Sequence, residues 1–440
     1  MIFISEEIML EKKYDYTSLL LFLLAIFSTM PIVSIPIGGK CISIFSFLLP
    51  ITLLKIFFDG IYIEHFSKTE KLFFSFLLFS LLGSFFGFFY FWGESNFSII
   101  AISSIPKILI YFSLGYILFC ARLKENQIKV MATGLLTGAI LNLIWASLDG
   151  VLFYISGLSI NNKTFSYYLK YQSEGLIRYG MLSLTYGDKG IRACGFNYDP
   201  SHIGMLAPFV FAYSLISEKK WLIFLVVFSA LASQSVTVIA SSLIILLFFN
   251  LLAKKNIKQT IIIVTVILIS LFFITQTPLG NALYRVKERS IEKIDDKTEK
   301  YRKIYNFQFP LALLNSPIHV LWGTGFGTAS NAFYRAGLID FYEMYDPENT
   351  YVSYLFDLGF IGLIFYIKLL YEIIKITWIN SKKFPNKANS IVLASCFAIC
   401  SSNIFYHYIL YATTMMMLIT SCMWCRHFNK KILFLQNNGK

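Results

Sequence analysis

Two arginines stand in polar segments that lead directly into apolar ones. Arg192 lies at the start of the polar stretch 191–202, and Arg302 precedes an apolar stretch with two prolines. A guanidinium keeps its charge and offers two parallel hydrogen bonds to the oxygens of an anion. Both arginines are therefore candidates for binding an anionic group. The alternative for each of them is an exposed charge or a contact with a lipid headgroup.

An acidic and an amide residue stand together directly before another apolar segment. Glu348 and Asn349 precede the segment that begins at residue 350. A shielded carboxylate has a raised pKa and can take a proton from a hydroxyl group. Equally, a carboxylate is favoured near a helix N-terminus by the helix dipole, and an asparagine there caps the helix. Two roles therefore remain open for Glu348, a general base or a structural residue. Two roles also remain open for Asn349, contact with a ligand or a helix cap.

The elements that must position these residues are apolar helices. The chain has 440 residues, of which 56% are hydrophobic and only 14% are charged, and 18% are aromatic. In a chain of ordinary water-soluble domains, about a quarter of all residues are charged. The composition therefore predicts an all-α polytopic membrane protein. We expect about twelve spans, near 17–35, 41–58, 71–92, 100–120, 130–157, 202–217, 221–233, 235–253, 259–278, 350–378, 389–408 and 410–426.

The net charge of +13 comes largely from lysines and arginines in the short connections between apolar runs. If the N-terminus is inside, these connections are cytoplasmic, as the positive-inside rule requires. Both termini are then cytoplasmic, and the charge needs no nucleic acid to explain it. Two long polar segments fall on the outer side. This divides the chain into a five-helix bundle (1–157), a first outer loop (158–201), central helices (202–278), a second outer loop (279–349) and C-terminal helices (350–440).

Three local patterns occur in one order along the chain. The first is R-x-x-G-x-x-x-D-P, formed by Arg192, Gly195, Asp199 and Pro200. The second is the G-x-G-x-G of residues 323–327, interpreted as a tight turn because it lacks the features of a nucleotide loop. The third is Glu348-Asn349, nine residues, Gly359, two residues and Gly362. In this order the patterns resemble the O-antigen polymerase and ligase superfamily of bacterial envelope glycosyltransferases, whose ligases have His-Asn where this chain has Glu-Asn.

The resemblance implies a fold like that of the C-type membrane glycosyltransferases, in the bacterial inner membrane, with two large periplasmic loops. It implies lipopolysaccharide biosynthesis, with glycans on undecaprenyl diphosphate as donor and acceptor, membrane lipids around the chain and a chain-length regulator protein as a possible partner. Arg192 and Arg302 would stabilise the leaving diphosphate, and Glu348 would activate the acceptor hydroxyl. Asn349, Asp199 and Gly195 would contact substrate. Neither a metal nor another cofactor is expected, because the nearby acidic residues are interpreted as loop polarity.

The favoured function is an O-antigen polymerase, since a ligase is expected to have histidine at position 348. An O-antigen ligase that transfers glycan to lipid A core is the nearest alternative. A flippase or transporter of lipid-linked oligosaccharide is the alternative from another class. It predicts charged residues within the spans and short outer loops, which the sequence does not have.

Overall fold

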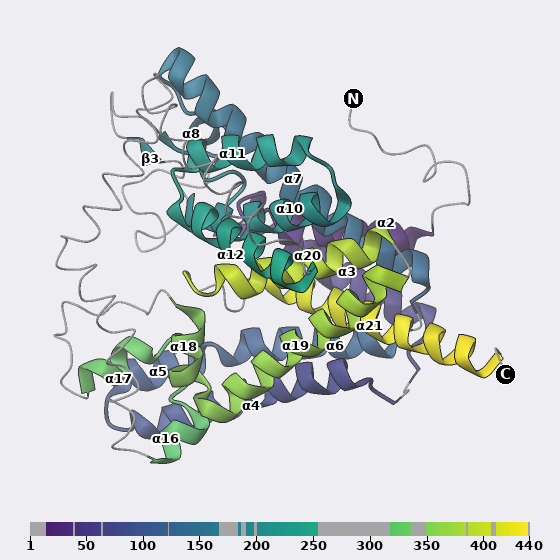
Figure 1. Ribbon diagram of the computed structural model, residues 1–440. Coiled ribbons are helices and arrows are strands. Elements are labelled where there is room, and N and C mark those ends of the chain that lie inside the picture. Colours follow the sequence, from purple (N-terminus) through teal and green to yellow (C-terminus); the bar gives the residue numbers. More distant parts are fainter. Residues whose placement is uncertain are drawn as a thin grey trace.

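The computed structural model is mostly helical (Figure 1). It describes residues 15–37, 40–62, 65–121, 123–166, 184–185, 191–197, 200–253, 317–335, 349–383, 386–405 and 411–438. In the first half the helices are α2 (Tyr16–Ser28), α3 (Ile44–Asp59), α4 (Lys68–Tyr90), α5 (Ser95–Ser103), α6 (Ile105–Cys120), α7 (Glu125–Ser156) and α8 (Ile160–Thr164). In the second half they are α10 (Ile203–Ser217), α11 (Trp221–Ser233), α12 (Val236–Ala253), α16 (Pro317–Trp322), α17 (Ala329–Arg335), α18 (Thr350–Asp357), α19 (Gly359–Lys383), α20 (Lys387–Ser402) and α21 (Ala412–Asn438).

Two small hairpins and one 3-10 turn complete the described elements. Strand β1 (Ser34–Ile37) pairs antiparallel with β2 (Lys40–Ser43), and β3 (Leu184–Thr185) pairs antiparallel with β4 (Ile191–Arg192). The 3-10 turn η2 (Pro200–His202) leads into α10. All of these elements join helices, so the layers of the fold are helical.

Three helices among the described residues are long and apolar enough to cross a membrane, namely Lys68–Tyr90, Asn96–Cys120 and Glu125–Ser156. Shorter apolar helices include α2, α10, α11 and α20. This agrees with a helical membrane protein. The expected span at 259–278 lies outside the described residues.

The long helix α7 lies at the centre of the bundle, where it packs against α2, α10, α11 and α21. Its glycines allow α2 to approach closely. A Cβ on Gly134 would lie 2.7 Å from the carbonyl oxygen of Phe22, and one on Gly138 would meet the side chain of Thr29. The close contact joins segments that are more than a hundred residues apart in sequence. It holds α7 in place, and the loops that follow α7 pack against this helix.

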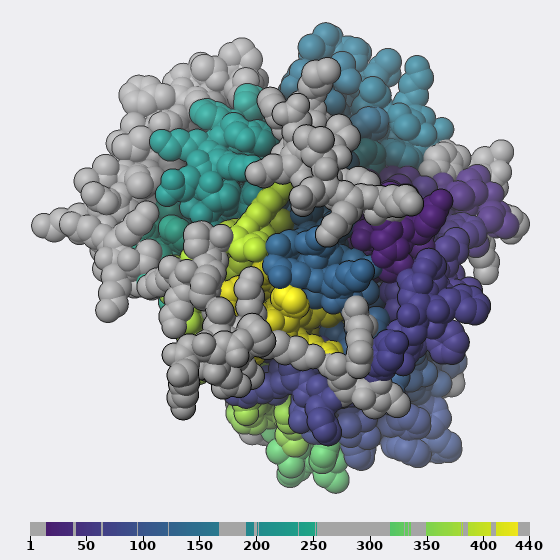
Figure 2. Space-filling model, turned by 90° about the vertical axis from the view of Figure 1, so that its right-hand side faces the viewer, coloured from purple at the N-terminus to yellow at the C-terminus, as the bar shows by residue number. Residues whose placement is uncertain are grey.

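The bundle has two chemically different ends. The end that we call the charged end carries side-chain contacts between helices far apart in sequence. These contacts are Lys68–Glu372 (2.6 Å), Arg426–Glu70 (3.3 Å) and His427–Glu125 (3.0 Å). Figure 2 looks onto this side, where the yellow α21 lies beside the blue start of α7.

The opposite end, which we call the loop end, comprises the C-terminal ends of α2, α11 and α20 and the N-terminal ends of α10, α12, α18 and α21. Hydrogen bonds of neutral groups join these ends to one another. They are Thr413 Oγ1 to the Ser28 carbonyl (2.7 Å), Ser402 Oγ to the Gly204 carbonyl (3.0 Å) and the Thr350 amide to the Asn403 carbonyl (2.8 Å). In Figure 1 the small loop elements α8, β3 and α16–α18 lie on the left, and the C-terminus lies on the right.

Two helix breaks shape the loop end. Helix α11 ends at Ser233 and α12 begins at Val236, so this break falls where the sequence predicts it. The segment 350–378, expected as one continuous span, is instead divided into α18 and α19. The break lies at Gly359, whose φ of 65° belongs to the left-handed region that favours glycine.

Candidate functional site

The first polar loop is attached to the centre of the bundle through buried amides. The side chain of Asn142 on α7 is fully buried, and its Oδ1 accepts hydrogen bonds from the Phe196 amide (2.9 Å) and from Nδ2 of Asn197 (2.9 Å). Asn161 on α8 donates through Nδ2 to the sulfur of Cys194 (3.0 Å). A buried side-chain amide with hydrogen-bond partners holds a loop in one position, because breaking one of these bonds leaves a buried polar group unpaired, which costs free energy. Residues 193–197 are therefore held against α7.

Arg192 lies at the edge of this anchored loop, beside the end of α11. The amide of Ala193 donates to the Ala232 carbonyl (2.9 Å), and Nε of Arg192 donates to the Ser233 carbonyl (3.4 Å). The residue is partly buried. The two terminal nitrogens of Arg192 have no hydrogen-bond partner among the described residues. The guanidinium is thus attached at one edge and has its forked edge available for an anion.

Gly195 has a structural reason to be glycine at this place in the loop. Its φ is 63°, and a Cβ there would lie 3.0 Å from the carbonyl oxygen of Asn142 and 3.1 Å from its Oδ1. A side chain would therefore be strained and would crowd the anchor. Contact of Gly195 with substrate stays a prediction.

Asn349 is the N-cap of α18. Its Oδ1 accepts from the amides of Tyr351 (2.9 Å) and Val352 (3.2 Å), as a capping asparagine does. Both hydrogen bonds use the oxygen, and within the described chain the Nδ2 of Asn349 has no partner. The cap is therefore observed, and the amide nitrogen remains available for a ligand, so the two interpretations are compatible.

The loop end brings the neighbourhoods of Asn349 and of the first loop together through α20. Thr350, next to Asn349, donates its amide to the carbonyl of Asn403, and Ser402 contacts Gly204 at the start of α10. Helix α10 directly follows the turn η2, which closes the first loop. Arg302, Glu348 and Asp199 lie outside the described residues. The predicted convergence of Arg192 with Arg302 stays a prediction.

The glycine-rich segment 323–327 is a turn, as its composition predicts. Gly323, Gly325 and Gly327 have φ values of 80°, 99° and 74°. The amide of Gly325 donates to the Asp357 carbonyl (3.1 Å), so the turn lies against the end of α18. A Cβ on Gly323 would collide with the carbonyl group of Asp357. Glycines are therefore required where the second loop meets the break between α18 and α19.

Next to this turn, α16 and α17 pack on the end of α4. The Arg335 guanidinium lies 4.4 Å from the centre of the Tyr90 ring and 3.7 Å from a carboxylate oxygen of Glu94. His319 contacts the Tyr90 ring and shares a hydrogen bond with the Gly323 carbonyl (3.2 Å). Burial lowers the pKa of His319, the Gly323 carbonyl opposes this, and the positive charge of Arg335 lowers the pKa further. His319 is therefore a mostly neutral ring at neutral pH.

One residue of the loop end was not found from the sequence. Gln234, in the break after α11, is 2% exposed and has a φ of 49°. Both polar atoms of its amide are buried, and they have no hydrogen-bond partner among the described residues. The sequence places a break here, but it gives no signal for the burial or for the unpaired amide.

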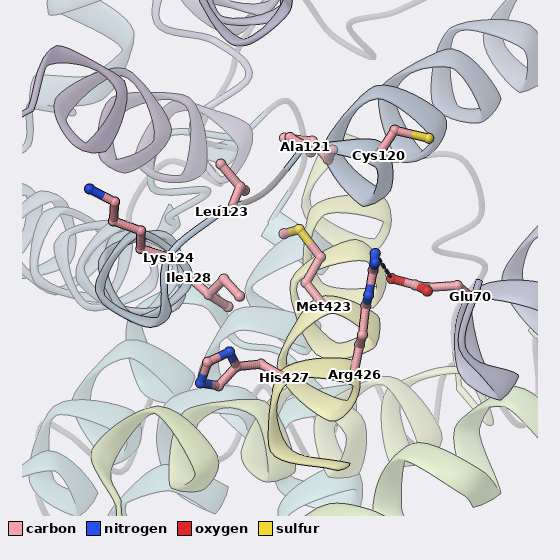
Figure 3. A pocket seen from close by; sticks show the side chains of 10 residues that line it. Glu70, Cys120, Ala121, Leu123, Lys124, Ile128, Met423, Arg426 and His427 are labelled. Carbon is pink, nitrogen blue, oxygen red and sulfur yellow. Dashed lines mark hydrogen bonds and ion pairs between the residues drawn. The ribbon is translucent and has the colours of Figure 1, made fainter. Parts of the chain in front are cut away.

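A pocket of about 520 Å³ lies at the charged end (Figure 3), and neither Arg192 nor Asn349 lines it. Glu70, Arg426 and His427 line it, and Arg426 also donates to the Phe119 carbonyl (2.5 Å). The buried carboxylate of Glu70 is paired with Arg426 and with the N-terminus of its own helix. The polar side chains of this pocket therefore join α4, α6 and α21, and none of the predicted site residues lies there.

The comparison with known families agrees with the resemblance of the motifs. A family model described as O-antigen ligase matches residues 221–367, from α11 into α19. The matched segment contains Gln234, the turn 323–327 and Asn349, and it begins after Arg192. No sequence among the curated proteins matches the chain. The match supports a place for this chain in the O-antigen polymerase and ligase superfamily, whose members are glycosyltransferase-like enzymes.

Proposed function

We propose that the chain is an O-antigen polymerase of the bacterial inner membrane. It would transfer a growing glycan from one undecaprenyl diphosphate to the nonreducing end of a second lipid-linked repeat unit, on the periplasmic side. The loop end of the bundle would be that side, and the charged end would be cytoplasmic. The proposal includes the twelve spans and the C-type glycosyltransferase fold that the motifs imply.

The reaction needs a stabilised leaving group and an activated acceptor. The acceptor hydroxyl oxygen attacks the anomeric carbon of the donor sugar, and the bond from that carbon to the diphosphate oxygen breaks. The bonding electrons go to the diphosphate, and the hydroxyl proton goes to the carboxylate of Glu348. Charge that develops on the diphosphate is stabilised by the guanidinium groups of Arg192 and Arg302.

The observation that supports this proposal most directly is the state of Arg192. Its Nε is bound to the Ser233 carbonyl, and its forked edge has no partner among the described residues. A guanidinium in a purely structural role normally uses its terminal nitrogens on carboxylates or carbonyls of the protein. The free fork matches two oxygens of a phosphate group.

A ligase that transfers glycan to lipid A core is the second candidate, because the matching family model is described as O-antigen ligase. The polymerase is favoured because residue 348 is glutamate. The two functions predict different lipopolysaccharides in a deletion strain. Loss of a polymerase leaves single repeats attached to core, whereas loss of a ligase leaves long chains on the lipid carrier.

The decisive experiment uses the purified full chain and a purified lipid-linked repeat unit, with no metal added. Polymerase activity would give a ladder of longer lipid-linked glycans on a gel. Arg192→Ala should abolish the ladder while the protein is recovered from membranes in normal amounts. A normal ladder from Arg192→Ala would refute its assignment. In a second reaction with lipid A core added, transfer to the core without any ladder would refute the polymerase in favour of the ligase.

A further inference from the structure

Gln234 combines two unfavourable features in one residue. Its φ of 49° places a side chain with a Cβ in the left-handed region, where glycine or asparagine is usual. Its amide is buried, and neither Oε1 nor Nε2 has a hydrogen-bond partner in the part of the chain that the structure describes. Buried amides in proteins are nearly always paired, whereas the left-handed backbone is the ordinary C-cap conformation with which α11 ends. A glycine would relieve the strain, and an apolar residue would remove the unpaired group.

The position of Gln234 connects it with Arg192. Arg192 donates through Nε to the carbonyl of Ser233, which is the residue directly before Gln234. The neighbouring Ala193 donates to Ala232. The helix break therefore lies against the loop that carries Arg192, whose terminal nitrogens have no partner among the described residues. The break is held there by two hydrogen bonds from residues of the first loop.

The same helix pair has further unpaired polar atoms. The hydroxyl oxygens of Ser241 and Ser242 on α12 are buried and have no hydrogen-bond partner within the described ranges of the chain. Val238, one turn before them, is buried as well. Gln234 thus begins a short series of buried groups with unused hydrogen-bonding capacity. Such a series is expected where a polar ligand completes the bonding.

We infer that Gln234 is a substrate-binding residue of the same site as Arg192 and contacts the diphosphate end of the lipid-linked donor. Its Nε2 donates a hydrogen bond to a phosphate oxygen beside the guanidinium. A neutral donor suits this place, because it adds a hydrogen bond to the dianionic group and brings no further charge close to the guanidinium of Arg192. The inference rests on the proposed function, since it takes the diphosphate of that donor as the ligand.

The test measures binding of farnesyl diphosphate to the purified chain in detergent by calorimetry, with farnesol as the probe that lacks the diphosphate. The wild type should bind farnesyl diphosphate and not farnesol. Gln234→Leu removes the amide at similar size and should weaken binding by about tenfold or more, since hydrogen bonds to charged groups are the stronger class. Its melting temperature should be unchanged or higher, because the substitution removes an unpaired buried group.

A matched control is Asn331→Leu in α17, where Nδ2 is also buried and has no partner among the residues that the structure describes. This variant should bind farnesyl diphosphate as the wild type does. Unchanged binding by Gln234→Leu, with a lower melting temperature, would show a structural amide and overturn the inference. If that variant does not fold, Gln234→Glu decides, because it keeps the size but replaces the donor by a negative charge. Wild-type affinity of Gln234→Glu would overturn the inference equally.

The outcomes also separate this inference from the proposed function. If the wild type binds farnesyl diphosphate and Arg192→Ala loses that binding, the anion site is present whatever Gln234 does. Retained binding by Gln234→Leu would then refute the role of Gln234 alone. If the wild type does not bind the diphosphate, or binds farnesol equally well, the diphosphate site and the role of Gln234 fail together.

Discussion

Nε of Arg192 lies 3.4 Å from the carbonyl oxygen of Ser233, at the point where α11 ends. The contact joins the first polar loop to a helix end 41 residues further along the chain. It orients the guanidinium by one edge and leaves the opposite edge free of protein partners within the described chain. The orientation depends on the planar shape of the group as well as on its charge.

Arg192→Lys tests whether this shape matters. Lysine keeps the positive charge but cannot donate to Ser233 and at the same time present a two-pronged donor to phosphate. We expect polymerisation to fall by about tenfold or more, which is about 1.4 kcal/mol of transition-state stabilisation. The melting temperature should change little, because the side chain is partly exposed. Initial rates with a lipid-linked repeat measure the effect.

Arg335→Lys is the matched control for the arginine prediction. Arg335 is also near the loop end, but it contacts Glu94 and the Tyr90 ring. Its substitution should leave the initial rate close to that of the wild type. Equal losses of activity in the two variants would contradict a specific role for Arg192.

Asn349 allows its cap to be separated from ligand contact. Asn349→Ala should destabilise the protein by about 1 kcal/mol, since the amides of Tyr351 and Val352 lose their acceptor. Asn349→Asp retains an acceptor at the N-cap, so its melting temperature should be close to that of the wild type. It lacks the Nδ2 donor, however. If Asn349 contacts substrate, Asn349→Asp should raise KM for the lipid-linked repeat.

The pair of variants decides between the two roles of Asn349. Full activity in Asn349→Asp would show that the residue serves only as a cap. Reduced activity at wild-type stability would show that the amide nitrogen is used. Thermal unfolding in detergent and steady-state kinetics on the same preparations give both quantities.

The turn 323–327 provides a comparison of two glycines with similar backbone conformations. Gly323→Ala adds left-handed strain and also a collision with the carbonyl group of Asp357. Gly327→Ala adds only the strain, because nothing lies within 4 Å of its Cβ position. We expect a loss of about 1 to 3 kcal/mol for Gly327→Ala and a clearly larger loss for Gly323→Ala. Equal melting temperatures of the two variants would show that the close packing of Gly323 against Asp357 does not add to the loss of stability.

His319 predicts a dependence of stability on pH. Burial holds the pKa of His319 below its usual 6.5, so the unfolded chain takes up this proton at a higher pH than the folded chain. Stability should therefore fall as the pH drops from above about 6.5 through the lower folded pKa. Protonation also adds a charge near Arg335.

The pH effect is checked with His319→Gln, which remains neutral and can still donate to the Gly323 carbonyl. Melting temperatures of the wild type and the variant should differ little at pH 8, and the wild type should lose more stability on acidification to pH 5. Parallel curves would rule out His319 as the source of any acid destabilisation.

The sequence predicts those features that depend on local chemistry. Apolar runs predict the helices, the polar residues at 233–235 predict a break, and three alternating glycines predict a turn. The sequence indicates a cap at Asn349 as one of two interpretations, because asparagine is an N-cap residue type and stands directly before an apolar segment. Each of these features follows from residues that are neighbours in the chain.

Features that depend on distant contacts could not be predicted. The division of the expected span at Gly359 depends on its packing against the backbone of Leu321 and Gly323 in the preceding loop. The unpaired amide of Gln234 depends on how α11 and α12 are buried among other helices. Neither property has a signal in the residues nearby. They become visible only when segments far apart in sequence are placed together.

The two ends of the bundle should respond differently to the solvent. The charged end is fastened by ionic contacts such as Lys68–Glu372, whose lysine is largely exposed, and concentrated salt weakens attraction between exposed charges. The loop end is fastened by neutral hydrogen bonds such as that from Thr413 to Ser28, which do not depend on ionic strength in this way. Buffers of high ionic strength should therefore loosen the charged end first and preserve the neutral contacts of the loop end.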